Sequence, residues 1–163
     1  DAVNPSGVTL TDGTTKDTIS PYVLELGGIF KVDLVTLAVN VYTGKGTAPM
    51  VGSFLQAGDI GDTGWWVNAG VNASKQVSLW VFYGGEKLNT TDLALWIVDN
   101  AANSPKSGNQ TIGAEVRWQD GGYAFALEWY NMGTKYRAVP GAAGWNEQTT
   151  HANQLLLTAG YFF

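Results

Sequence analysis

Charged and amide side chains recur at every second position inside otherwise apolar stretches of this chain. Glu115 and Arg117 are two positions apart, so in an extended strand they share a face and can form an ion pair. A face of this kind can line an aqueous path and set its ion preference, or it can form an internal salt-bridge network that only neutralises buried charge. The residues that we expect on such a face are Glu25, Lys31, Asn40, Asn68, Glu115, Arg117 and Glu128.

Groups that could catalyse a reaction or bind a metal are sparse. The chain has no Cys, and its single His, His151, is in a polar run that we expect to be a solvated loop. This composition excludes most metal sites built from His or Cys, and His151 has no Ser partner in a recognisable nucleophile motif. We therefore expect no catalytic residues, no metal and no cofactor. The net charge of −5 argues against a nucleic-acid partner.

The composition favours a β-rich chain. Gly accounts for 21 of the 163 residues, roughly twice its usual share of about 7%, and only 14% of the residues are charged. Seven Trp and seven Tyr are many for this length. A helical enzyme needs charges on its solvated faces, so this combination points away from one. No apolar run approaches the roughly 20 residues of a membrane helix, which leaves a soluble β-sandwich or a membrane β-barrel.

Alternation of apolar and polar residues predicts seven strands. One face of each strand is nearly free of charge, and the other face carries the charged residues. Short turns join the strands at one end, including the hairpin signal "QDGG" at 119–122, and long loops join them at the other. The strand lengths cluster near those that cross a membrane. The expected strands cover 20–33, 34–44, 65–74, 77–87, 111–118, 123–131 and 154–163.

The end of the chain has a pattern of its own. Aromatic residues gather near the ends of the apolar faces, as in the girdles of membrane barrels. In "QLLLTAGYFF", alternate residues counted back from the end are Phe163, Tyr161, Ala159, Leu157 and Leu155. This pattern resembles the C-terminal signature of Gram-negative outer-membrane β-barrel proteins, and the rhythm of strands and loops resembles that of porins. The resemblance implies an antiparallel transmembrane β-barrel in outer-membrane lipid, with a last strand that the barrel-assembly machinery recognises.

An odd number of strands conflicts with this resemblance, because bacterial single-chain barrels have an even number. An open sheet in lipid would leave unpaired backbone groups along both edges. We therefore expect residues 21–163 to form barrel strands that are closed in one of two ways. Either the chain is the C-terminal part of a larger porin barrel, or residues 1–20, which otherwise read as a polar extracellular loop, supply a weak eighth strand despite Pro5.

An apolar segment interrupts the loop after the fourth expected strand. In "NTTDLALWIVDNA", Thr90 or Thr91 can cap a short helix, and an alternative is that 93–98 form a further strand. In a porin, such a segment narrows the lumen or contacts a neighbouring subunit. The alternative is that it packs on the rim of its own barrel. The residues that we expect to form this constriction or interface loop are Asp92, Leu93, Leu95, Trp96 and Asp99.

Together these features predict a porin-like outer-membrane channel for passive diffusion of ions and small hydrophilic solutes. The resemblance suggests a homotrimer, and the excess of acidic residues suggests a preference for cations. One alternative is a small closed eight-stranded barrel whose loops have a structural or adhesive role. Another is a soluble β-sandwich that serves as a binding module.

Overall fold

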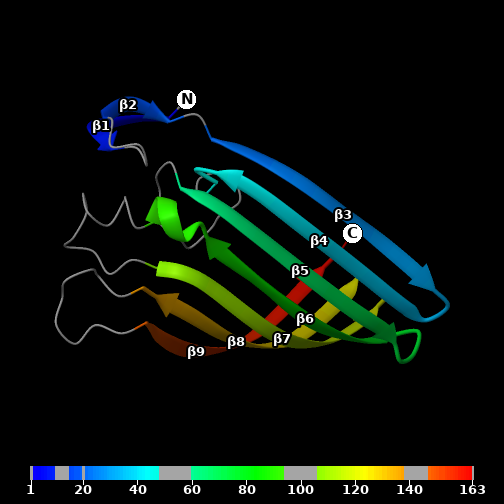
Figure 1. Ribbon diagram of the computed structural model, residues 1–163. Helices are drawn as coiled ribbons and strands as arrows, with labels where there is room; N and C mark the ends of the chain where they lie inside the picture. The colour runs from blue at the N-terminus through cyan, green and yellow to red at the C-terminus, as the bar shows by residue number, and fades with distance from the viewer. Residues whose placement is uncertain are drawn as a thin grey trace.

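A single antiparallel sheet of seven strands dominates the fold (Figure 1). The structure is a computed structural model, and it describes residues 2–9, 15–19, 21–47, 60–93, 106–137 and 147–162. Strands that follow one another in the chain are neighbours in the sheet, which confirms the prediction of an all-β chain with seven strands. The strands are β3 (Tyr22–Val32), β4 (Val35–Lys45), β5 (Gly61–Asn72), β6 (Val77–Leu88), β7 (Lys106–Asp120), β8 (Tyr123–Tyr136) and β9 (Gln148–Tyr161).

Several strands extend beyond their predicted bounds, mostly toward the long connections. β5 begins four residues before Trp65, and β9 begins six residues before Gln154. β8 continues to Tyr136, five residues past its predicted end. These extensions are rich in Thr, Asn, Gly and Lys, so they lack the apolar alternation that reveals a strand. Main-chain hydrogen bonds to the neighbouring strand hold them in the sheet instead.

Short turns at 33–34, 73–76 and 121–122 join the strands at one end of the sheet, the turn end. Asp33 has a φ of 51° and Gly121 a φ of 55°, so two of these turns use a residue in the left-handed region. Gly121 belongs to the predicted hairpin signal, and Asp is among the few other residue types that tolerate this conformation. The longer connections 46–60, 89–105 and 137–147 join the strands at the opposite end, the loop end.

The first part of the chain forms a separate two-stranded sheet of β1 (Ala2–Thr9) and β2 (Thr15–Ile19). Their register shifts between Val3 and Val8, a stretch that contains Pro5, which cannot donate a hydrogen bond to the ladder. Residues 1–20 were expected to form a polar loop or one weak strand, and the structure instead places two paired strands there. Neither strand pairs with an edge of the large sheet in the part of the chain that is described.

Alternation and register divide the large sheet into two faces. The polar face carries the row Glu25, Tyr42, Gly64, Glu86, Asn109, Thr134 and Thr150, in which each residue is opposite the next. The apolar face carries the intervening residues. Large apolar side chains on it are exposed in every strand, for example Leu26 in β3 at 75% and Leu157 in β9 at 80%. The apolar side chains of this sheet therefore point outward rather than into a shared core.

The sheet is open in the part of the chain that the structure describes, because β3 and β9 each pair on one side only. It twists and curls, and β7, β8 and β9 curve behind the other strands in Figure 1. Among the described residues, the buried large apolar side chains are at the loop end, where Ile60, Leu88 and Leu93 are at most 4% exposed. Of the described helical segments, none is long and apolar enough to cross a membrane.

Candidate functional site

The residues predicted to line a pore all lie on the polar face, because the register connects their strands without interruption. Contacts bring most of them into two groups rather than one cluster. Lys31 is exposed near the turn end and belongs to neither group. The full set is Glu25 and Lys31 on β3, Asn40 on β4, Asn68 on β5, Glu115 and Arg117 on β7, and Glu128 on β8.

The first group joins β3 and β4. Asn40 Nδ2 donates a hydrogen bond to Glu25 Oε1 across 2.5 Å. Gly27 is directly opposite Asn40, and a Cβ at position 27 would come within 2.9 Å of the same amide nitrogen. The glycine therefore gives the Asn40 amide room to reach Glu25. The amide oxygen of Asn40 is buried and has no hydrogen-bond partner among the described residues.

The second group joins β7, β8 and β9. Arg117 Nε lies 2.7 Å from Glu115 Oε1, which confirms the predicted ion pair. Glu115 is directly opposite Glu128, so two carboxylates face each other across adjacent strands. Glu128 accepts a hydrogen bond from the Tyr130 hydroxyl at 2.7 Å and one from Thr158 Oγ1 at 3.4 Å. The guanidinium and the two hydroxyl groups offset the repulsion between the carboxylates.

Aromatic rings cover glycines on the polar face. Trp80 lies across Gly70, and Tyr130 lies across Gly113, so closely that a Cβ at either glycine would overlap the ring. A void of about 60 Å³ remains beside these rings, and Asn68 is one of the residues that line it. The rings therefore occupy part of the space above the polar face, and Glu115 lines the remaining void beside them.

Two acidic residues near the loop end were missing from the predicted set. Glu86 accepts a hydrogen bond from Asn109 Nδ2 across 3.3 Å. Asp62 is 4% exposed and accepts a hydrogen bond from Thr47 Oγ1, while its other carboxylate oxygen has no partner among the described residues. Alternation within its predicted strand could have added Glu86. Asp62 precedes the predicted start of β5, so no sequence pattern indicated it.

A short helical turn at 90–93 follows β6. Asn89 Oδ1 accepts hydrogen bonds from the backbone N–H groups of Thr91 at 2.9 Å and Asp92 at 3.1 Å. Asn89 is therefore the N-cap, and the expectation that Thr90 or Thr91 caps the helix is wrong. An Asn side chain caps a helix as readily as a Thr side chain does, and Asn89 was missing from the predicted caps.

The described part of the expected constriction or interface loop packs on the rim of the sheet. Asp92 Oδ2 accepts a hydrogen bond from the backbone N–H of Gly61 at 2.9 Å, which ties the helical turn to the start of β5. Leu93 is fully buried at 0% exposure. These contacts match the alternative in which the segment packs on its own rim. The remaining members of that predicted set, Leu95, Trp96 and Asp99, lie outside the described residues.

Two rows of aromatic side chains bound the apolar face. Near the loop end, Trp65 and Tyr83 pack edge to face, with ring centroids 5.0 Å apart. At the turn end, the rings of Tyr123 and Tyr161 have centroids 4.9 Å apart. Along β8, the six steps from Tyr123 to Trp129 span about 20 Å at roughly 3.4 Å per residue. The face is thus a band of apolar side chains with aromatic rings along both borders.

Polar side chains replace apolar ones directly beyond the loop-end row. Gln110 Nε2 donates a hydrogen bond to the Tyr83 hydroxyl. Farther along the same border, Asn131 Nδ2 donates to Asn153 Oδ1 across 3.0 Å. Both pairs bridge adjacent strands. The change from apolar to hydrogen-bonded polar side chains therefore occurs at a similar level in β6 to β9.

The C-terminal residues of the predicted assembly signature lie on the apolar face of β9. Each is opposite an apolar residue of β8, and the pairs from the strand middle to the turn end are Leu155 with Trp129, Leu157 with Leu127, Ala159 with Phe125, and Tyr161 with Tyr123. Phe163 lies outside the described residues. β9 therefore continues the apolar band of β8 to the edge of the sheet.

His151 is in β9, opposite Gly133, and the expectation that it is a loop residue is wrong. It is exposed, and its polar neighbours in the sequence hid the strand. Among the described residues, no group of three or more His, Cys, Asp or Glu side chains is arranged to hold a metal ion.

Comparison with protein-family models, with curated protein sequences and with solved structures found no match to this chain. The functional proposal therefore rests on the apolar and polar faces of the sheet.

Proposed function

We propose that this chain forms wall strands of a porin-like channel in a Gram-negative outer membrane, which passes ions and small hydrophilic solutes by diffusion. The observation that carries the proposal is the separation of side chains by face. A broad apolar band with aromatic borders covers one face of all seven strands, and hydrogen-bonded carboxylates occupy the other. This is the arrangement expected of a barrel with lipid outside and water inside.

The exposed band is difficult to reconcile with a soluble protein. Monomeric soluble proteins rarely expose apolar patches larger than a few hundred Å². Here the large apolar side chains of the band that are more than half exposed include Leu24, Leu26, Phe30, Val81 and Leu155. A soluble β-sandwich would cover this face with a second sheet, whereas the second described sheet has only the two strands β1 and β2. Lipid is the covering that best fits the band.

The proposal requires further strands that close the sheet. The free edges of β3 and β9 would each leave roughly ten backbone groups unpaired in lipid, at several kcal/mol per group. That cost exceeds the roughly 5–15 kcal/mol stability of a domain. We infer that additional strands of a larger porin barrel pair with these edges. The proposal includes a homotrimer, which rests on the resemblance of the strand-and-loop rhythm to that of porins. It also includes recognition of β9 by the barrel-assembly machinery, which rests on the resemblance of residues 155–163 to the C-terminal signature of outer-membrane barrels.

The polar face supports a preference for cations. Acidic side chains outnumber basic ones on it, and a carboxylate-lined path with apolar surroundings concentrates cations. The carboxylates come from five different strands, so they would be distributed around the wall of the channel. They are Glu25, Asp62, Glu86, Glu115 and Glu128.

A second candidate is a small closed barrel with a filled interior, whose loops bind partners. The observation that favours it is that the charged groups on the polar face are largely satisfied by neighbours on the same face, as in the Glu115–Arg117 pair. Trp80 and Tyr130 also fill space there by covering glycines. A filled barrel needs such internal neutralisation, whereas a wide channel can leave its charges to water.

Conductance separates the two candidates. The intact protein, extracted from its membrane in detergent, is added to a planar lipid bilayer at fixed voltage. A diffusion channel gives discrete, ohmic current steps. In a salt gradient, the reversal potential of these steps should show a preference for cations. A filled barrel inserts without steps, and insertion is checked independently by protease protection in vesicles. Insertion without any conductance would reject the channel.

Intact mass provides the structural counterpart of this test. The large sheet has seven described strands, whereas closed bacterial barrels have an even number, and this chain has a mass of 17.4 kDa. A natural protein of much larger mass contains further strands, as the porin proposal requires. A mass close to 17.4 kDa together with a monomeric, protease-resistant barrel would favour the small filled barrel instead.

A further inference from the structure

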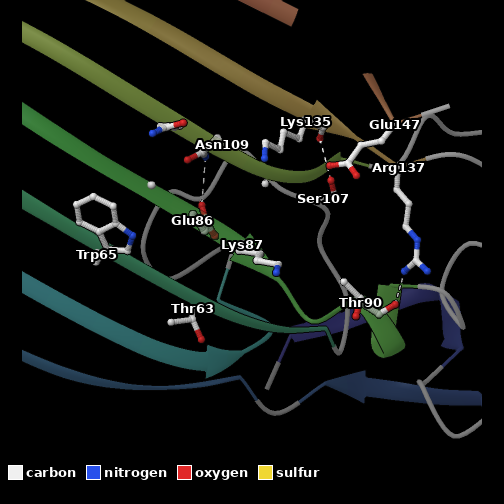
Figure 2. Close-up of a pocket in the computed structure, with 13 residues that line it drawn as sticks. Thr63, Trp65, Glu86, Lys87, Thr90, Ser107, Asn109, Lys135, Arg137 and Glu147 are labelled. Atoms are coloured by element: carbon white, nitrogen blue, oxygen red, sulfur yellow. Dashed lines mark hydrogen bonds between the residues drawn. The ribbon is translucent and has the colours of Figure 1, made fainter. Parts of the chain in front are cut away.

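A groove of about 790 Å³ lies at the loop end of the sheet (Figure 2). It lies over β5 to β8, on the side of the sheet that carries Trp65. Two neighbouring rows of the apolar face form its floor. The first row runs from Trp65 through Gly85 to Gln110, and the second runs from Thr63 through Lys87 and Gly108 to Lys135.

Two lysines flank the middle of this groove. Lys87 projects from β6 and Lys135 from β8, and Gly108 of β7 is directly opposite both of them. Strands two apart in a sheet are about 10 Å from each other, so two flexible lysine side chains can converge on one group between them. Glycine at position 108 has no side chain to occupy that space. The register thus builds a gap with an ammonium group on each side.

The charge of the groove is positive. Neither Lys87 nor Lys135 forms an ion pair with another described residue. Arg137 also lines the groove and donates a hydrogen bond to the carbonyl oxygen of Thr90. Glu147 contributes one carboxylate to the lining. Glu86 supplies a second carboxylate, which accepts a hydrogen bond from Asn109. Three cationic side chains against two carboxylates leave the lining of the groove net positive.

The groove begins where the apolar band ends. Lys87 is four residues beyond Tyr83 along β6, or about 14 Å along the strand. Tyr83 and Trp65 form the aromatic border of the band, and Ile112, directly opposite Tyr83, is 48% exposed. A molecule with a negative head and an apolar tail could therefore place each part against matching side chains.

We propose that this groove binds the phosphorylated headgroup of a membrane lipid, with the phosphate between Lys87 and Lys135 and the acyl chains against the band below Trp65. The inference rests on the proposed function, because it requires the apolar face to meet lipid. Lysine ammonium groups at the level of lipid headgroups are well suited to phosphate oxygens. The adjoining apolar band favours a phosphate carried by a lipid over a free phosphate ion.

The test measures retention of a defined lipid by the intact protein in neutral detergent. Native mass spectrometry compares dioleoyl phosphatidate with dioleoylglycerol, which has the same chains and no phosphate. We expect the wild type to retain phosphatidate and not dioleoylglycerol. The double variant Lys87→Gln and Lys135→Gln should lose about 10- to 30-fold in apparent affinity for phosphatidate. Lys75→Gln, in the exposed turn at the opposite end, is the matched control and should retain it.

The remaining outcomes are equally decisive. Equal retention of phosphatidate by the double variant and the wild type would overturn the inference. Displacement of phosphatidate by millimolar inorganic phosphate would overturn the choice of a lipid and indicate a free-anion site. Conductance of the same preparations keeps this result separate from the proposed function. Loss of lipid retention with normal conductance steps supports the site, whereas normal steps without any phosphatidate binding reject the site and leave the channel intact.

Discussion

The indole ring of Trp80 lies across the backbone of Gly70, the residue directly opposite it on the neighbouring strand. Tyr130 and Gly113 form the same relationship between β7 and β8. In each pair, the absence of a side chain on one strand creates the place for a ring on the next. These pairs fill the polar face without adding charge, and they pin the register, because a shift by one residue would place the ring over a side chain.

Gly70→Ala should destabilise the protein by about 1–3 kcal/mol, because the new methyl group displaces the Trp80 ring from its packed position. The measurement is urea unfolding in detergent micelles, followed by Trp fluorescence. The control is Gly28→Ala, since a Cβ at position 28 would meet its nearest neighbours, the Phe30 ring carbons, at an ordinary 3.5 Å. Equal unfolding midpoints for the two variants would show that the ring does not depend on Gly70.

Tyr130→Phe should destabilise the protein by about 1.5–3 kcal/mol, the usual range for a hydrogen bond to a charged group. The variant removes the 2.7 Å hydrogen bond to Glu128 and leaves that carboxylate facing Glu115 with one donor fewer. Tyr123→Phe is the control, because Tyr123 is exposed at the turn end, and its change should stay within about 0.5 kcal/mol. The same unfolding assay reports both. If Tyr123→Phe lost as much stability, the effect would come from removal of any tyrosine hydroxyl and not from the hydrogen bond to Glu128.

Glu115→Gln should lower the cation preference of the channel. The variant removes one negative charge from the polar face, and it is the charge that pairs with Arg117, so the face becomes more positive by one unit. The measurement is the reversal potential in a KCl gradient across a planar bilayer, which should move toward zero. Glu147→Gln changes charge by the same amount in the groove on the other side of the sheet and should leave the reversal potential unchanged. Identical shifts in both variants would mean that Glu115 does not face the ion path.

Leu93→Ala should cost about 2–5 kcal/mol, because Leu93 is fully buried and its truncation leaves a cavity at the loop end. Limited proteolysis should then cleave the connection after β6 earlier than in the wild type. Leu34→Ala, at a turn residue that is 59% exposed, is the control and should change neither readout appreciably. Unchanged proteolysis in Leu93→Ala would show that the helical turn at 90–93 is held by Asp92 and its hydrogen bond to Gly61 alone.

Most of the fold was predictable because its signals are local. A period of two assigns Glu25 and Leu26 to opposite faces wherever the strand lies in space. The turn at Gly121 was likewise readable from a short motif. The polar extension that contains His151 was not, because its strand depends on pairing with β8 rather than on its own side-chain pattern. Asp62 was missed for the same reason.

Local sequence patterns predicted the all-β class, the seven strands of the large sheet and the two faces, because each follows from neighbours along one strand or hairpin. They also indicated that Glu115 and Arg117 can form an ion pair, which the structure contains. The contacts between residues of different strands emerged from the three-dimensional arrangement. It placed Trp80 over Gly70 and Gly108 between Lys87 and Lys135, and it set β1 and β2 apart from the sheet. The physical reason is register: hydrogen bonds between strands align residues far apart in the chain, and no local pattern relates those residues to each other.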